Sequence, residues 1–168
     1  MMAADALGTG DPMTGLKKPD RKHLETWLAD SHVAFDHCGD CEGLHLAALQ
    51  SVDGVIDSRI FLEHWGILFT TELEIRPMAM LAVCADLGRL NMNYPTLKVF
   101  LDIVDDATPQ LVVAGTLPTG AGLSEAQCAH FVSTTMEGTR ELAAECLALD
   151  YLFPEGKSER APPSRALH

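Results

Sequence analysis

Two cysteines and a histidine in the first third of the chain have the spacing of a metal site. The segment is His37-Cys38-Gly39-Asp40-Cys41, and His45 follows four residues later. Two thiolates that are separated by two residues can reach one zinc ion from a tight turn, and a nearby imidazole can add a nitrogen ligand. Cys38, Cys41 and His45 are therefore the candidate zinc ligands of this sequence.

Three interpretations of this loop stay open. A structural zinc site normally has a second pair of ligands, and the sequence contains no second C-x-x-C motif. His37 and Cys38 are adjacent, which makes binding of one ion by both of them awkward. A redox-active pair normally lies at the N-terminus of a helix, where the dipole lowers the thiol pKa, whereas this pair precedes a short extended stretch. We favour an ordinary surface loop over zinc binding and over a redox pair.

The rest of the chain contains no catalytic motif. Cys84, Cys128 and Cys146 lie on apolar stripes of expected helices, so we predict that they are buried and unreactive. The end of a P-loop is suggested by a Gly-Lys-Ser segment at 156–158, but Tyr151 occupies the position of the required first glycine. No G-x-S-x-G motif is present. We expect no enzyme activity, and no cofactor other than zinc at the cysteine loop.

A helix and a pair of strands flank the cysteine loop. Asp20 can cap a helix whose buried stripe has i, i+3, i+4 spacing and consists of Leu24, Trp27 and Leu28. Residues 55–62 are rich in β-branched side chains, and residues 67–75 alternate between apolar and polar ones, which predicts two antiparallel strands. Because one side of that alternation is polar, we expect one face of the sheet to lie in water.

The second half of the chain predicts a helix, two strands and a long final helix. The first of these helices begins near Pro77, and its expected buried stripe is Leu81, Cys84, Leu87 and Leu90. Strands are expected at 97–103 and 111–117. Ser124 and Gln127 form a capping box for the final helix. Its apolar and small residues form a heptad-like seam made of Cys128, Val132, Thr135, Thr139, Leu142, Cys146 and Leu149. This order predicts an α+β fold in which helices pack on an antiparallel sheet.

Composition limits the classes of partner. The chain has 168 residues and a formal net charge of -12, and such an acidic protein repels nucleic acid and anionic lipid. No apolar run has the length of a membrane span, and the N-terminus does not resemble a secretion signal. The odd number of cysteines, five, argues against a secreted disulfide framework. We expect a cytoplasmic protein with one domain at residues 20–154, between disordered tails at 1–19 and 155–168.

Three segments between residues 43 and 151 carry a resemblance to a known family. They are GVIDSRIF at 54–61, LFTTEL at 68–73 and NMNYPTLKVFLD at 91–102. This part of the chain resembles the YbjN family of bacterial proteins, which are described as sensory transduction regulators. The resemblance implies a fold like that of type III secretion chaperones, with the element order α-β-β-β-α-β-β-α. It supplies no catalytic residues and assigns no role to the cysteine pair.

Two functional hypotheses follow. The first is a non-enzymatic regulatory or chaperone-like module that binds a partner protein or a second copy of itself as a homodimer, through its sheet or its helix surface. The alternative is a metal-binding or thiol-redox protein that uses His37, Cys38, Cys41 and His45. We favour the first hypothesis, because the cysteine loop offers fewer ligands than a structural zinc site requires.

Overall fold

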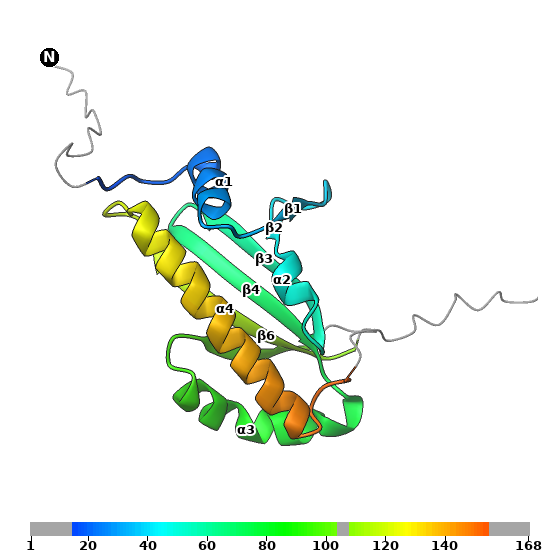
Figure 1. Cartoon of the computed structure of the whole chain (residues 1–168). Helices are drawn as coiled ribbons and strands as arrows, with labels where there is room; N and C mark the ends of the chain where they lie inside the picture. The colour runs from blue at the N-terminus through cyan, green and yellow to red at the C-terminus, as the bar shows by residue number, and fades with distance from the viewer. Residues whose placement is uncertain (1–14, 104–107, 155–168) are drawn as a thin grey trace, which may run out of the picture.

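The computed structural model describes residues 15–103 and 108–154. Within these ranges, six strands form one antiparallel sheet in the order β1-β2-β3-β4-β6-β5 (Figure 1). The elements follow one another as α1 (Arg21–Asp30), β1 (Asp36–His37), β2 (Leu44–His45), α2 (Ala47–Gln50), β3 (Val55–Glu63), β4 (Gly66–Glu74), the 3-10 helix η1 (Pro77–Ala79), α3 (Met80–Asn93), β5 (Lys98–Asp102), β6 (Gln110–Pro118) and α4 (Glu125–Ala148). None of the described helices has the length and apolar character needed to cross a membrane.

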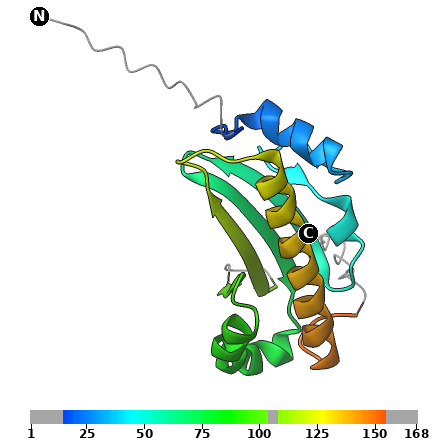
Figure 2. The same cartoon turned by 60° about the vertical axis from the view of Figure 1, so that its left-hand side comes forward.

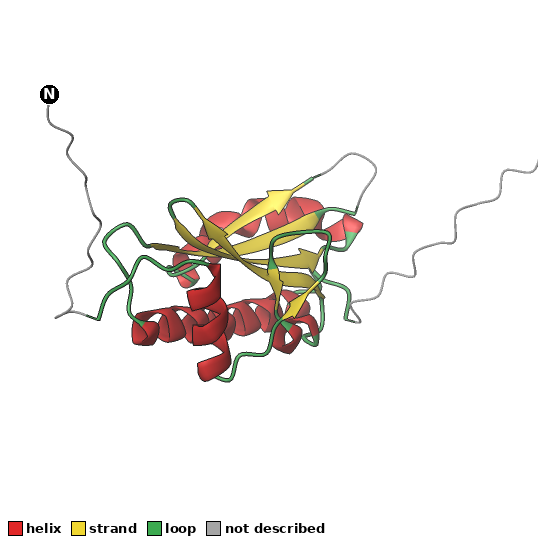
Figure 3. Ribbon diagram, turned by 90° about the horizontal axis from the view of Figure 1, so that it is seen from above, coloured by secondary structure: helices red, strands yellow, loops and turns green. Residues whose placement is uncertain are grey.

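The long helix α4 lies along one face of the sheet, and α1 crosses near its N-terminal end (Figures 2 and 3). Leu24 and Leu28 of α1 pack in one hydrophobic cluster with Val132 of α4 and with Phe69 of β4. The opposite face of the central strands carries charged side chains, among them Arg59, which pairs with Glu72. The predicted α+β class, with helices packed on an antiparallel sheet, is confirmed.

The first half of the chain follows the predicted order with two short additions, the strand β1 and the single-turn helix α2. Asp20 caps α1 by accepting a hydrogen bond from the backbone N–H of His23 at 2.8 Å. The predicted strand pair is present as β3 and β4, which pair from Val55↔Leu73 to Glu63↔Gly66. The apolar stretch at 44–49 divides into the short strand β2 and the single-turn helix α2. A two-residue strand, β1, pairs with β2 and was not predicted.

The predicted buried stripe of α3 is wrong in its first half. Leu81 is 79% exposed and Cys84 is also exposed, whereas Val83 and Leu90 are buried. The physical reason is helix geometry: at about 100° per residue, positions 81 and 90 lie on opposite sides of the helix, so four residues spaced by three cannot share one face. The prediction of a buried thiol therefore fails for Cys84, while Cys128 and Cys146 are buried as expected.

The predicted final helix is confirmed as α4, with the capping box of Ser124 and Gln127. Its seam residues from Cys128 to Cys146 are buried, and only Leu149, just after the helix, is exposed. These buried residues pack in the core of the same chain. The seam is therefore occupied within the chain, and it is not a free helix surface for a second copy.

The N-terminal boundary of the domain stays a prediction, and one contact made by the predicted tail bears on it. The predicted tail extends to residue 19, yet Lys17 exchanges two backbone hydrogen bonds with Leu123, at 3.0 and 2.8 Å. Leu16 and Lys17 thus lie against the segment that precedes α4. The remainder of both predicted tails, at 1–14 and 155–168, falls outside the described residues.

The core divides into two hydrophobic clusters with hydroxyl groups between them. On β4, Phe69 belongs to the first cluster and Leu73 to the second, and Thr71 lies between them. Ser58 and Thr71 are fully buried and share a hydrogen bond of 2.9 Å across β3 and β4. On α4, Thr139 lies between the two clusters, and its buried hydroxyl has no hydrogen-bond partner among the described residues.

Removing the hydroxyl of Thr139 and removing that of Thr71 should change the stability of the fold in opposite directions. Thr139→Val removes a buried and unpaired hydroxyl, so we expect it to raise the free energy of unfolding by about 1 kcal/mol. Thr71→Val leaves Ser58 buried without its partner and should lower the free energy of unfolding by about 1–3 kcal/mol. Urea denaturation followed by circular dichroism measures both changes. A loss of stability in Thr139→Val would show that this hydroxyl is hydrogen-bonded.

Candidate functional site

One edge of the sheet is open because β6 extends beyond the end of its neighbour β5. β6 pairs with β4 along its whole length, from Glu74↔Gln110 to Gly66↔Pro118. On its other side β5 covers only positions 110–114, because the β5 pairing ends at Lys98↔Ala114. Residues 115–118 therefore have a strand on one side only within the described part of the chain. Their outward backbone groups form a free edge.

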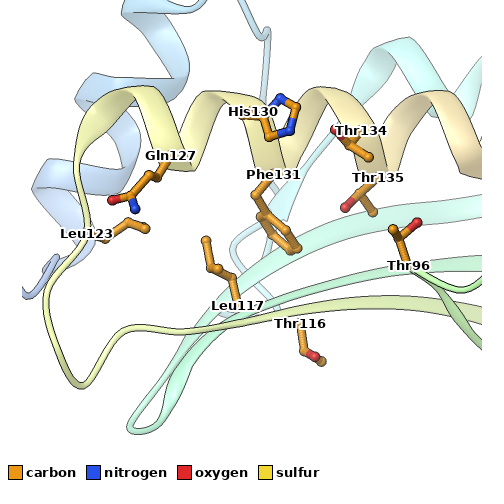
Figure 4. Close-up of a pocket in the computed structure, with 9 residues that line it drawn as sticks. All are labelled: Thr96, Thr116, Leu117, Leu123, Gln127, His130, Phe131, Thr134 and Thr135. Atoms are coloured by element: carbon orange, nitrogen blue, oxygen red, sulfur yellow. The ribbon is translucent and has the colours of Figure 1, made fainter.

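A pocket of about 460 Å³ opens between this edge and the N-terminal half of α4. Figure 4 shows the side chain of Phe131 extending from α4 toward β6, beside Leu117 of β6. Leu123 lies at one end of the pocket and Thr96 at the other. The remaining lining residues are Thr116, Gln127, His130, Thr134 and Thr135. The exposed lining is mostly apolar, and threonine hydroxyls lie around it.

Gly115 explains why α4 comes so close to β6 at one end of the pocket. A Cβ atom at this position would lie 2.8 Å from the hydroxyl oxygen of Thr135 and 3.3 Å from the ring of Phe131. The helix therefore packs on bare backbone at Gly115. Two positions further along β6, Leu117 is only half-buried, as is Phe131 above it. The sequence pattern did not indicate this pocket, because it predicted strands of equal length at 97–103 and 111–117.

The cysteine loop is a hairpin between β1 and β2, and it brings three of the four predicted residues together. The Sγ atoms of Cys38 and Cys41 are 3.3 Å apart, and Cys41 Sγ is 3.3 Å from Nε2 of His45. His37 is not part of this group, because its Nδ1 faces Arg21 at 3.1 Å and its Nε2 faces Glu25 at 3.7 Å. The two sulfur atoms are not joined in a disulfide.

Asp57 is a member of this site that sequence reasoning missed. Its Oδ1 lies 2.9 Å from Nδ1 of His45 and accepts hydrogen bonds from the side chain of Gln50 at 2.7 Å and from the backbone N–H of Ser58 at 2.8 Å. A β-bulge between Val55 and Asp57 interrupts the regular pairing of β3 at this point. The only signal in the sequence is an acidic residue inside an apolar strand.

The electrostatics of the cluster favour a thiolate beside a positive imidazole. The hydrogen bond with Cys41, aided by the backbone N–H of Asp40, lowers the pKa of the Cys38 thiol to about 7. Burial lowers the pKa of His45, but its contacts with Cys41 and Asp57 outweigh burial and raise that pKa to about 9. In the neutral ring, the Nδ1–H donates to Asp57, so the lone pair of Nε2 points toward the sulfur of Cys41. The group can therefore hold either a proton or a metal ion between sulfur and nitrogen.

Comparison with known proteins places the chain in a family. Residues 20–148 match the model of the YbjN family, which carries the description "Putative bacterial sensory transduction regulator". The chain is 39% identical over 142 residues to the uncharacterized protein YbjN of Escherichia coli K12, covering 84% of this chain and 90% of that protein, and it is equally similar to YbjN of Shigella flexneri. A crystal structure titled "YbjN, a putative transcription regulator from E. coli" superposes with a TM-score of 0.80 and 38% identity, covering 83% of this chain and 99% of the other. The open edge, the pocket and the cysteine loop are thus features of a member of the YbjN family.

Proposed function

We propose that this protein is a non-enzymatic regulator that binds an extended segment of a partner protein along the free edge of β6. The observation that carries the proposal is that residues 115–118 continue beyond the end of β5 at the place where an apolar pocket opens. Unpaired backbone groups on an edge strand accept an added strand, and a pocket for alternate side chains selects the sequence of that strand. The family description as a regulator agrees with a protein that acts by binding.

The pocket defines the chemistry of the bound segment. A strand added beside Leu117 would direct every second side chain toward α4, because successive side chains of a strand point to opposite faces. Those side chains would meet Leu117, Leu123 and Phe131. Among the lining residues only His130 is titratable, so the pocket does not select strongly for the charge of the bound segment. We expect the segment to carry aliphatic residues at alternate positions, with at least one facing Phe131.

Peptide selection tests this proposal directly. Random peptides displayed on phage are selected on the full-length protein, and recovered sequences are titrated against it by fluorescence polarisation. We expect alternating aliphatic residues, and slower hydrogen exchange at those amides of residues 115–117 that point away from β4 when the peptide is bound. Leu117→Glu places a charge in the pocket and should weaken binding by about tenfold or more. Thr134→Trp, which fills the pocket from α4, should do the same.

Phe100→Glu is the matched control. Phe100 is 39% exposed on β5, next to β6, but Val99 and not Phe100 faces the core, so a glutamate at 100 lies on the opposite face of the sheet. Binding by this variant should equal that of the unmodified protein. Peptides that protect amides elsewhere would contradict the proposal. Protection of the outward amides of residues 115–117 in the protein alone, rising with its concentration, would instead identify a second copy as the added strand.

A further inference from the structure

We propose that Cys38, Cys41 and His45 bind a zinc ion, with Asp57 orienting His45. This inference goes beyond the binding function proposed above. The two sites lie toward different edges of the sheet, since the cluster lies at the β1–β2 hairpin at one edge, while β6 lies next to β5 at the other edge. Either proposal can therefore fail without the other.

The candidate ligand atoms lie near the separations that zinc requires. Cys38 Sγ, Cys41 Sγ and a ring nitrogen of His45 all lie within 4.8 Å of one another. With Zn–S bonds of about 2.3 Å and Zn–N bonds of about 2.0 Å, adjacent ligand atoms of a tetrahedral site are about 3.5–3.8 Å apart. The observed contacts of 3.3 Å between the two sulfurs and between Cys41 and His45 are close to these values. A small outward movement of the exposed Cys38 would admit the ion.

The contact between His45 and Asp57 is a second, independent observation. Histidines that bind zinc commonly donate their other ring N–H to a carboxylate, which holds the ring and its tautomer. Nδ1 of His45 faces Asp57 at 2.9 Å, and Asp57 is itself held by Gln50 and by the backbone of Ser58. These groups lie on α2 and β3, outside the cysteine loop. Nε2 is thereby presented to the cysteines before any ion arrives.

The donor set selects the class of metal. Two thiolates and an imidazole suit zinc, whereas magnesium and calcium bind through oxygen ligands. His37 is turned toward Arg21 and Glu25, and the described residues bring no fourth cysteine, histidine or carboxylate into this group. The fourth position would be taken by water or an external ligand. Cys38 is exposed and Cys41 is partly so, which allows the ion to enter from solvent.

Metal titration of the full-length protein tests this site. The protein is reduced, treated with a chelator and desalted, and zinc is then titrated in competition with a chromophoric chelator. Cobalt serves as the spectroscopic probe, because thiolate-to-cobalt charge transfer reports sulfur ligands and the intensity of the visible bands reports tetrahedral geometry. We expect one zinc per chain and a tetrahedral cobalt spectrum with sulfur charge transfer. Binding should also raise the melting temperature of the protein.

Three variants separate the ligands from the group that orients them. The double variant Cys38→Ser, Cys41→Ser should lose binding, and the single change Cys38→Ser at the exposed position serves if the double variant does not fold. Asp57→Asn should weaken zinc binding by about 10–100-fold while the cobalt spectrum stays tetrahedral, because its role is to position His45. A changed spectrum with unchanged affinity would contradict that role.

Two variants serve as matched controls. Cys84→Ser removes an exposed cysteine on α3, and His37→Ala removes the neighbouring histidine that points away from the cluster. Both should bind zinc like the unmodified protein. Zinc binding that survives in the cysteine variants, that is lost in Cys84→Ser, or that is no tighter than about millimolar would overturn the proposal.

Discussion

Replacing Gly66 with alanine is expected to lower the free energy of unfolding by about 3 kcal/mol or more. Gly66 begins β4 and lies opposite Pro118 at the end of β6. A Cβ atom at this position would overlap the carbonyl oxygen of Leu117 and lie 2.9 Å from Cα of Pro118. Both obstacles are backbone atoms, so the clash cannot be relieved by a change of rotamer. Relief requires that β6 move away from β4 and break the pairing there.

Gly88→Ala provides the matched control. Gly88 lies in α3, and a Cβ added to it would meet no heavy atom within 4 Å among its non-local neighbours. Alanine is favoured over glycine inside a helix, so this change should raise the free energy of unfolding by up to about 1 kcal/mol. Guanidinium denaturation of both variants provides the comparison. A Gly66→Ala protein as stable as the unmodified one would mean that β4 and β6 are further apart than in this structure.

The second large effect is expected from two charges placed in the α4 seam. Val132 and Leu142 are 1% and 0% exposed, and they belong to the first and second hydrophobic clusters respectively. A glutamate at either position buries a carboxylate without a partner, which costs several kcal/mol. Because a whole domain is stable by only about 5–15 kcal/mol, the double variant Val132→Glu, Leu142→Glu should be unfolded. Far-UV circular dichroism and light scattering after gel filtration report the outcome.

The double variant Ser133→Glu, Leu149→Glu controls for added charge. Ser133 is an exposed residue of α4 and Leu149 is the exposed residue at its C-terminal cap. This variant adds the same two carboxylates at the surface and should stay folded. A folded, monomeric product from the seam variant would contradict the intramolecular packing. If the unmodified protein is a dimer in the same measurement, that result would show that the seam is an interface between copies.

Local patterns in the sequence were sufficient for the longer helices and strands. The cap at Asp20, the capping box at Ser124, the polar face of β4 and the buried stripe of α1 all depend on residues within one or two turns of each other. Backbone geometry sets the periods of 3.6 and 2 residues, so such features can be recognised without knowledge of any partner. The α+β class follows from their order. The spacing of Cys38, Cys41 and His45 also indicated where a metal could bind.

Contacts between distant segments decided what those elements do. The buried side of α3 depends on the positions of β5 and α4. The pattern of the α4 seam is compatible both with core packing and with an interface between copies, and the position of the sheet against it decides for core packing. Asp57 becomes the partner of His45 only through a bulge in β3 and the pairing of β2 with β3. The free edge at 115–118 arises because β5 stops short of it. Strand register, bulges and helix orientation are set by packing across the whole domain, so the composition of a single segment does not encode them.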